Sequence, residues 1–452
     1  MKHVAIIGNG VAGITAARHI RRMTDHRITV ISAESDHFYS RTALMYIYMG
    51  HMAYENTKPY EDWFWEKNRI DLVRGYVEAI DTAGRLLALA DGRRIGYDML
   101  LVATGSEPNM AGWPGEDLQG VQGLYGLQDL EAMERNTAGI RRGVVVGGGL
   151  IGVEVAEMLH SRHIPVAFLV REETYMSRIL PREEGEMVNR HLREHGIDLR
   201  TGTELREILP DENKRVRAVV TTAGEEIPCE FVALTIGVRP NISLLEGSDI
   251  EVNRGVLVND CFETNIPGVY AAGDCAEFRD PGPGRAAVEQ LWYTGRRHGE
   301  AAALNICGIR TPYDRGVWFN SARFFDIEYQ TYGDVLPVPA GGEGTLYWEH
   351  PEGRRCIRIN YRTGDRRVTG FNLFGIRYRH AVCASWIAEG RTLEYVLENL
   401  GAANFDPEFF PQFEREVVDL YNRNHGNGAA VLKRRRGLFQ HIFSRGGHRE
   451  RT

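Results

Sequence analysis

The sequence predicts an α/β protein of several domains, in which short apolar strands alternate with helices. Three observations support this fold class. The chain has 452 residues, whereas a single hydrophobic core stops growing at roughly 250–300 residues. A buried strand, a glycine-rich turn and a helix follow one another twice, over residues 3–23 and 143–159. From about residue 318 onward, short runs of strand-forming residues predict an antiparallel sheet.

The first glycine-rich turn has the spacing of a dinucleotide-binding site. The strand HVAIIG leads into Gly8-Asn9-Gly10-Val11-Ala12-Gly13 and then into a helical pattern. In such a turn Gly8 permits the tight bend, Gly10 lets backbone N–H groups approach a pyrophosphate, and Gly13 lets the helix pack on the strand. The following strand, RITVIS, ends near Glu34. A carboxylate about 20 residues after the loop accepts hydrogen bonds from a ribose diol.

The same arrangement recurs in GVVVGGGLIGVEVAEML, where Gly147, Gly149 and Gly152 lie between a strand and a helix. We therefore expect a second dinucleotide site in the same chain. Its next strand, PVAFLV, ends at Val170, where an NAD-binding enzyme usually has an acid. Arg171, beside this missing acid, favours the 2′-phosphate of NADPH. The alternative is that Arg171 is only solvated and Glu172 serves as the acid, which predicts NADH.

The composition predicts a soluble, cytoplasmic protein. Hydrophobic residues make up 43% and charged residues 25% of the chain, and no apolar run approaches the roughly 18 residues of a membrane span. The N-terminal MKHVAIIG enters a strand directly, without the regions of a signal peptide. A net charge of −7 argues against nucleic acid as a partner. The 6 cysteines show no CxxC or metal-type spacing, so we expect buried thiols and no metal site.

Three further segments indicate a family. YDMLLVATGSEP (97–108), LTIGVRPN (234–241) and TNIPGVYAAGDCAEF (264–278) stand in the order and spacing of two crossovers and a second FAD fingerprint. With its two dinucleotide sites, the chain resembles the FAD-dependent pyridine nucleotide-disulfide oxidoreductases. The resemblance implies that Asp274 binds the ribityl chain or pyrophosphate region of FAD. It also implies two Rossmann-like dinucleotide-binding domains, for FAD and NAD(P)H, and an α+β C-terminal interface domain.

The implied domain boundaries follow the crossovers. The FAD-binding domain is discontinuous, and the interface domain is expected to contain the strands GTLYWEH, CIRINYR and VTGFNLFG. The expected domains are FAD-binding 1–108 and 235–317, NAD(P)H-binding 109–234, interface 318–425, and a basic amphipathic tail 426–452.

The segment HFYSRTALMYIYMG should lie against the flavin in such a protein. Arg41 occupies the position of the single cysteine of related NADH oxidases, so the resemblance implies electron transfer without an active-site disulfide. Glu34, Tyr39, Arg41 and Leu44 match the branch of rubredoxin reductases, ferredoxin reductases and NAD(P)H-nitrite reductase flavin subunits. One departure is Tyr46, which replaces the lysine that pairs in many ferredoxin reductases with the glutamate found here as Glu154. Glu154 could contact the nicotinamide, or could have a capping or packing role.

Other residues are expected around the flavin. The segment 286–308 is predicted to be a helix whose N-terminal end, near Glu289 and Gln290, points at the pyrimidine edge of the isoalloxazine. Eight aromatic residues line the open face of the flavin or belong to ordinary packing: Tyr46, Tyr48, Trp63, Trp65, Trp292, Tyr293, Trp318 and Phe319. No catalytic residue is certain, with Glu154 and Arg41 nearest the chemistry. The expected cofactor-binding residues are Gly8, Gly10, Val11, Ala12, Gly13, Glu34, Arg41, Ala103, Thr104, Gly105, Gly147, Gly149, Leu150, Ile151, Gly152, Glu154, Arg171, Gly237, Gly273, Asp274, Glu289 and Gln290.

We therefore expect an enzyme that moves a hydride from NAD(P)H to FAD and then passes electrons to an external acceptor, such as a small iron–sulfur redox protein. Two alternatives remain open: a peripheral membrane NAD(P)H:quinone dehydrogenase, and a non-enzymatic flavoprotein of the apoptosis-inducing-factor type. A homodimer or a larger redox complex is compatible with either.

The C-terminal tail carries seven Lys/Arg and one Glu between residues 426 and 452. Apolar residues at helical spacing beside the run Lys433 to Arg436 predict a helix over 431–445 that lies on the cytoplasmic face of an anionic membrane. The alternatives are docking on the protein's own acidic surface or on a sister subunit, and simple disorder.

Overall fold

The computed structural model describes residues 1–282, 284–425 and 429–433. The chain forms two compact units. The N-terminal unit comprises residues 1–176 and 192–315, and the C-terminal unit comprises residues 177–191 and the residues from 316 onward. The predicted tail therefore lies outside the described residues, except for 429–433.

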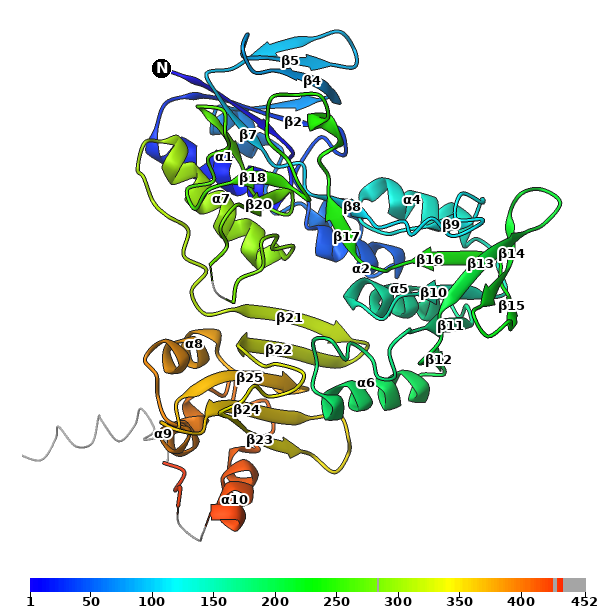
Figure 1. Cartoon of the computed structure of the whole chain (residues 1–452), viewed down its shortest axis with the longest axis vertical. Coiled ribbons are helices and arrows are strands. Elements are labelled where there is room, and N and C mark those ends of the chain that lie inside the picture. Colours follow the sequence, from blue (N-terminus) through cyan, green and yellow to red (C-terminus); the bar gives the residue numbers. More distant parts are fainter. Residues whose placement is uncertain (283, 426–428, 434–452) are drawn as a thin grey trace, which may run out of the picture. The chain divides into compact units, whose positions relative to one another are not determined.

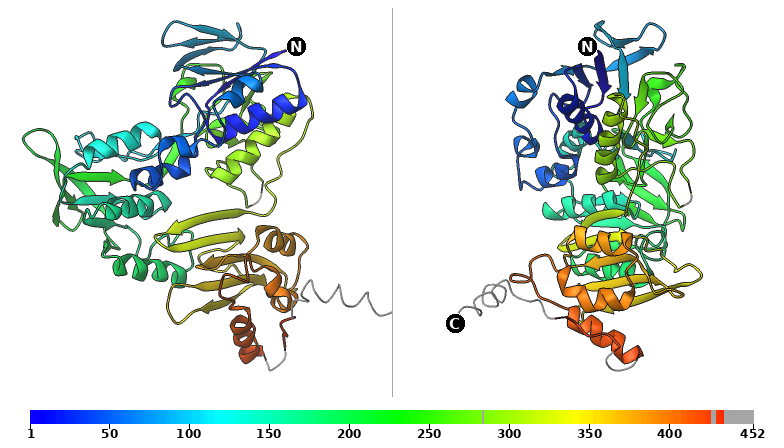
Figure 2. Two further views of the ribbon diagram at one scale, coloured as in Figure 1. Left: turned by 180° about the vertical axis from the view of Figure 1, so that it is seen from behind. Right: turned by 90° about the vertical axis from the view of Figure 1, so that its left-hand side faces the viewer.

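The first sheet of the N-terminal unit is a parallel sheet of the order β19-β7-β1-β2-β3. Its strands are β1 (His3–Ile7), β2 (Arg27–Ser32), β3 (Ile70–Arg74), β7 (Met99–Val102) and β19 (Val269–Ala271). Figure 1 labels the strands β7 and β2 of this sheet. The central strand β1 pairs in register with β2 on one side, where Ile7 faces Ile31, and with β7 on the other. Helices α1 (Val11–Met23) and α7 (Trp292–Ile306) lie side by side against this sheet (Figure 2).

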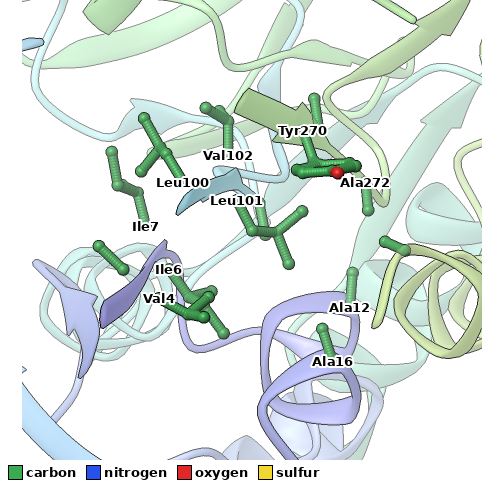
Figure 3. Packing of buried hydrophobic residues seen from close by; sticks show 14 of the residues in the cluster. Val4, Ile6, Ile7, Ala12, Ala16, Leu100, Leu101, Val102, Tyr270 and Ala272 are labelled. Carbon is green, nitrogen blue, oxygen red and sulfur yellow. The ribbon is translucent and has the colours of Figure 1, made fainter. Parts of the chain in front are cut away.

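The core of this sheet explains why β1 and β7 are continuous apolar runs. Val4, Ile6, Leu100 and Leu101 have no exposed surface, and Ala16 of α1 lets the helix approach closely (Figure 3). Both faces of a parallel sheet are covered, so its strands do not alternate between apolar and polar residues.

The second sheet has the same plan, with the order β12-β11-β10-β16-β9. Its strands are β9 (Val121–Gln122), β10 (Gly143–Val146), β11 (Val166–Leu169), β12 (Asp198–Arg200) and β16 (Phe231–Leu234), with α5 (Leu150–Ser161) packed on β10, β11 and β16. Two short antiparallel sheets accompany the parallel ones. They are formed by β4 (Val77–Asp81), β5 (Leu86–Leu89) and β6 (Arg94–Gly96), and by β13 (Leu205–Pro210), β14 (Val216–Thr221) and β15 (Glu226–Pro228).

The two predicted crossovers form a two-stranded antiparallel link between the segments that carry these sheets. Strand β8 (Ser106–Pro108) pairs with β17 (Val238–Pro240), so Ser106 faces Pro240. The chain thus has the predicted α/β class with two Rossmann-like dinucleotide-binding folds.

The C-terminal unit contains a five-stranded antiparallel sheet of the order β21-β22-β25-β24-β23. Three predicted strands are confirmed as β23 (Glu343–Glu349), β24 (Cys356–Arg362) and β25 (Val368–Phe374), joined by β21 (Phe319–Phe324) and β22 (Ile327–Gly333). Helices α8 (His380–Ala388), α9 (Leu393–Asn399) and α10 (Glu414–His425) share an apolar core with the sheet. Residues 177–191 belong to this unit, although they lie inside the segment expected to form the NAD(P)H-binding domain. Within them Glu184 accepts a 2.6 Å hydrogen bond from Arg358 of β24.

The helix predicted over 286–308 is shorter than expected. The N–H of Phe278, at the end of β20 (Ala276–Phe278), donates to the carbonyl of Ala287, and Val288 forms a bridge with Glu277. Residues 287 and 288 therefore extend a small sheet, and α7 begins only at Trp292. No helix in the described part of the chain is long and apolar enough to cross a membrane.

Candidate functional site

A cavity of 580 Å³ opens at the carboxyl ends of the first sheet. Its wall includes Ala33, Ala103 and Ala272, each of which directly follows a strand, β2, β7 and β19 respectively. Ligands of open parallel sheets bind at this end, where the loops diverge. The fold therefore places a binding site where the glycine-rich turn after β1 is found.

The turn after β1 can be built only with glycine at two positions. Gly8 has φ +112°, and a Cβ there would lie 2.1 Å from the carbonyl oxygen of Ala103. A Cβ on Gly13 would lie 2.1 Å from the carbonyl oxygen of Gly8, so Gly13 sets the approach of α1 to β1. Gly10 is the N-cap of α1 and supplies no side-chain cap. The first N–H groups of the helix are thus left for a phosphate.

Glu34 lies in the cavity wall after β2 and is held by several donors. Arg41 donates to both carboxylate oxygens, at 2.8 Å to Oε1 and 2.5 Å to Oε2. The Tyr39 hydroxyl and the Leu127 N–H also donate to Oε1. Burial raises the pKa of Glu34, but the charge and hydrogen bonds of Arg41 outweigh it and hold the pKa below its ordinary value. Oε2 retains a lone pair for a ribose hydroxyl.

Asp274 enters the same cavity after β19. The Ser106 hydroxyl donates to its Oδ2 at 3.1 Å and the Tyr125 hydroxyl at 3.3 Å. Gln290 donates in turn to the Ser106 oxygen at 2.8 Å. Both donors reach Oδ2, so Oδ1 is the oxygen left for a ligand. Burial raises the pKa of Asp274.

The second glycine-rich turn repeats the backbone of the first. Gly147 has φ +113°, and a Cβ on Gly152 would lie 2.2 Å from the Gly147 carbonyl oxygen. Gly149 is the N-cap of α5, again without a side-chain cap, and its carbonyl accepts a 2.8 Å hydrogen bond from Tyr175.

The end of β11 differs from the end of β2. Val170 is fully buried. The N–H of Gly147 donates to the Leu169 carbonyl as the N–H of Gly8 donates to the Ile31 carbonyl, so the counterpart of Glu34 by strand register is Glu172. Arg171 is 53% exposed and lies 3.1 Å from Glu172. The guanidinium is therefore open to solvent beside a carboxylate.

Glu154 of α5 also lines the cavity, together with Ile151. Within the described residues it makes no hydrogen bond or ion pair. Burial, with the charge of Glu157, raises the pKa of Glu154 to about 7. An acid without a partner in a cavity wall is a group that a ligand can engage.

A family model described as pyridine nucleotide-disulphide oxidoreductase matches residues 2–299. The chain belongs to this family. Its members bind FAD and NAD(P)H, and the cavity with its glycine turn, uncapped helix N-terminus and inward carboxylate fits FAD. A Cβ on Gly273 would lie 2.8 Å from the Ala12 Cβ, which marks a second close backbone approach at the site.

Several relatives indicate which members of the family the chain is similar to. The chain is 31% identical over 338 residues to nitrite reductase [NAD(P)H] of Bacillus subtilis, covering 74% of this chain but only 41% of that protein. It is 31% identical over 377 residues to the ferredoxin–NAD(+) reductase component of the p-cumate 2,3-dioxygenase system of Pseudomonas putida, covering 82% of this chain and 86% of that one. A ferredoxin reductase of Rhodopseudomonas palustris has a similar structure, with a TM-score of 0.75, 26% identity and coverage of 82% and 91%.

The cavity of this oxidoreductase gathers many of the predicted cofactor residues and leaves others outside its wall. Those in the wall are Gly8, Gly10, Val11, Ala12, Glu34, Arg41, Ala103, Thr104, Gly105, Ile151, Glu154, Gly273, Asp274 and Gln290. Gly13 packs behind it, and Gly147, Gly149, Leu150, Gly152 and Arg171 belong to the second turn. Gly237, with φ +105°, lies just before β17.

Glu289 is placed differently from the expectation. Its carboxylate accepts hydrogen bonds from Tyr313 and Arg285 in a buried cluster and does not face the cavity. The reason is the late start of α7, which puts Gln290, Leu291 and Trp292 at the cavity instead. Ser106 and Tyr125 were missed by sequence reasoning. Ser106 directly follows the ATG crossover and could have been found, whereas nothing in the sequence around Tyr125 marks it.

The predicted aromatic cluster is dispersed. Trp292 lines the cavity, but Tyr48 and Trp65 are buried in packing and Trp63 is 59% exposed. Trp318 and Phe319 belong to the C-terminal unit. None of the six cysteines, all within the described residues, lines the cavity.

Proposed function

We propose that this chain passes electrons from NAD(P)H, through bound FAD, to a small iron–sulfur redox protein without an active-site disulfide. The observation that carries the proposal is that none of the six cysteines, all of them among the described residues, lines the cavity, so no thiol stands there to relay electrons. With no thiol at the cavity, electrons leave by way of an external acceptor. Names of relatives support the class of acceptor, among them a rubredoxin-NAD(+) reductase of Ectopseudomonas oleovorans, 28% identical over 312 residues.

Bound FAD supplies the redox chemistry, and the protein supplies binding, orientation and electrostatics. The N-terminus of α1 and the Gly8 turn hold the pyrophosphate. Glu34 accepts from the ribose through Oε2, and Asp274 accepts from the ribityl chain through Oδ1. The Gly147 turn with α5 holds the nicotinamide nucleotide, and Glu154 faces the cavity from that helix.

We further propose NADPH as the preferred donor. Val170 offers no acceptor for a 2′-hydroxyl, while Arg171 is exposed and cationic beside it. Glu172, the counterpart of Glu34 by strand register, is the group that would favour NADH.

The quinone dehydrogenase alternative depends on membrane contact through 431–445, most of which lies outside the described residues. No observation on the described residues favours that contact over a soluble acceptor.

An anaerobic titration tests the proposal. NADPH or NADH should bleach the visible flavin absorbance, and added oxidised ferredoxin or rubredoxin should restore it by accepting the electrons. Restoration by a quinone but by neither iron–sulfur protein would support the quinone dehydrogenase. A flavin that NAD(P)H does not bleach would contradict both enzyme functions.

A further inference from the structure

A buried polar cluster lies directly behind the Gly273–Asp274 turn. His298 of α7 has no exposed surface, and Glu289 is 3% exposed. Neither residue lines the cavity. Burying an ionised carboxylate is costly unless it is paired and hydrogen-bonded, so such a cluster needs a physical reason.

The carboxylate of Glu289 contacts three side chains, those of Tyr313, His298 and Arg285. Oε2 accepts a 3.1 Å hydrogen bond from the Tyr313 hydroxyl and lies 3.3 Å from Nε2 of His298. Oε1 lies 3.3 Å from Nε of Arg285, whose guanidinium stacks 3.5 Å over the ring of Phe278. Arg285 therefore balances the charge of the carboxylate without help from the imidazole.

The other ring nitrogen of His298 contacts the backbone of the cofactor turn. The Gly273 N–H donates to Nδ1 of His298 at 3.3 Å. A nitrogen that accepts from an N–H cannot itself carry a proton, so the proton of the neutral ring is on Nε2, facing Glu289. Burial lowers the pKa of His298, in keeping with the neutral form. The Glu289 carboxylate and the Gly273 N–H thus select the tautomer of His298 that carries its proton on Nε2.

Gly273 is a sensitive place for such a contact. Its φ of +82° is in the left-handed region, and both Gly273 and the following Asp274 line the cavity. Rotation of the peptide before Gly273 would turn its N–H and shift Asp274. Glycine adopts this conformation and several others without strain, so contacts such as that with His298 are needed to fix the turn in one of them.

We propose that His298, oriented by Glu289, is a positioning residue that fixes the Gly273–Asp274 turn for FAD binding. The inference deepens the proposed function and rests on FAD occupying the cavity. The role of Glu289 is then indirect, in place of the direct flavin contact expected from the sequence.

Two substitutions test the contacts of the two ring nitrogens of His298 separately. In H298N the amide oxygen can take the place of Nδ1 and accept from Gly273, but the contact with Glu289 is lost. In H298Q the amide can reach Glu289, but the Gly273 N–H loses its acceptor. Each variant loses one hydrogen bond, so both should lower the Tm of the apoprotein by similar amounts.

FAD affinity should distinguish them. Measured by quenching of flavin fluorescence on adding apoprotein, the Kd should stay within about threefold of wild type in H298N and rise roughly tenfold in H298Q, as expected for one lost hydrogen bond. Equal affinities, or weaker binding by H298N, would overturn the proposal. A wild type that binds FAD but fails to reduce an iron–sulfur protein would contradict the proposed function alone.

A measurement on the wild type keeps the proposal testable if both variants fail to fold. ¹⁵N NMR of the histidine ring reports the tautomer. The proposal requires a protonated Nε2 and an unprotonated Nδ1 at His298, and the opposite tautomer or an imidazolium at neutral pH would overturn it.

Discussion

The two βαβ segments of the N-terminal unit, β1–α1–β2 and β10–α5–β11, share a backbone and differ in their side chains. Gly8 and Gly147 have φ of +112° and +113°. In each segment a Cβ on the third glycine, Gly13 or Gly152, would lie 2.1 or 2.2 Å from the carbonyl oxygen of the first glycine. Phosphate binding thus demands the same turn twice, because the constraint is steric.

The ends of the following strands differ instead. Glu34 is a part-buried carboxylate with four donors, whereas its counterpart by strand register, Glu172, pairs with the exposed Arg171. Two residues after the third glycine, the first helix has the buried Thr15 and the second has Glu154. The comparison teaches that the backbone recognises the pyrophosphate, while side chains decide which nucleotide binds.

The largest effect is expected from the shared turn. Gly8→Ala forces a Cβ against the Ala103 carbonyl at a φ of +112°, so we expect loss of FAD and a fall in the free energy of unfolding of about 2 kcal/mol or more. Gly10→Ala is the matched control, because its Cβ meets nothing within 4 Å and the apoprotein should keep its Tm. Gly147→Ala should spare FAD and abolish nicotinamide nucleotide binding. Flavin absorbance and nucleotide titration measure the two losses. If both variants lost both nucleotides, the two turns would not be specific for separate nucleotides.

Next in size is the acid at the end of β2. Glu34→Gln leaves the guanidinium of Arg41 without its charge partner, which should cost about 3 kcal/mol of stability. Because the pKa of Glu34 is lowered in the fold, its contribution is fully present above the ordinary carboxyl pKa of about 4.3 and is lost as pH falls through the lowered value.

Asp71→Asn in β3 is the control, because its carboxylate is 55% exposed and pairs with the exposed Arg27, and it should change stability by less than about 0.5 kcal/mol. Urea unfolding of both variants at neutral and acidic pH measures the difference. Equal costs would mean that Glu34 is no better coupled than a surface acid.

Substitution of Glu154 should have a smaller effect on stability than substitution of Glu34, and in the opposite direction. With a folded-state pKa of about 7, the folded protein binds more protons than the unfolded chain between pH 4.5 and 7, so stability falls as pH rises through that window. Glu154→Gln should remove this slope and stabilise the apoprotein above pH 7 by about 2 kcal/mol. Thermal unfolding against pH measures it, and an unchanged slope would show that Glu154 is already ionised at neutral pH.

Arg171→Glu should shift the ratio of Kd values for NADPH and NADH about tenfold toward NADH, since it removes a 2′-phosphate partner worth about 1.4 kcal/mol. Arg206→Glu is the control, because Arg206 is 52% exposed and pairs with the adjacent Glu207 in the same way. A shift of equal size in both variants would mean that the change in net charge, and not a contact of Arg171 with the 2′-phosphate, alters the nucleotide preference.

The smallest effect concerns thiols. Alkylation of the accessible cysteines of the native protein, of which Cys307 is the partly exposed one, should change the rate of electron transfer by less than about twofold. Inactivation with FAD still bound would contradict transfer without a thiol.

The position of helix α7 illustrates where sequence reasoning stops. Residues 286–291 have good helix propensity and continue the pattern of the helix, yet Ala287 and Val288 pair with β20. Propensity is a weak preference that tertiary pairing overrides. This pairing turned Glu289 away from the cavity and into the cluster with His298.

By itself, the sequence determined the two dinucleotide-binding folds, the crossovers, the strands of the C-terminal unit and the likeness to the oxidoreductase family. These depend on local spacing, because glycines, strand length and helix period act within some 30 residues. Only the tertiary structure decided that Tyr125 and Ser106 donate to Asp274, that Arg41 donates to both oxygens of Glu34, and that residues 177–191 join the C-terminal unit. Such contacts join residues up to 168 positions apart. No local pattern encodes them, since they arise only when separate strands end at one edge of a sheet.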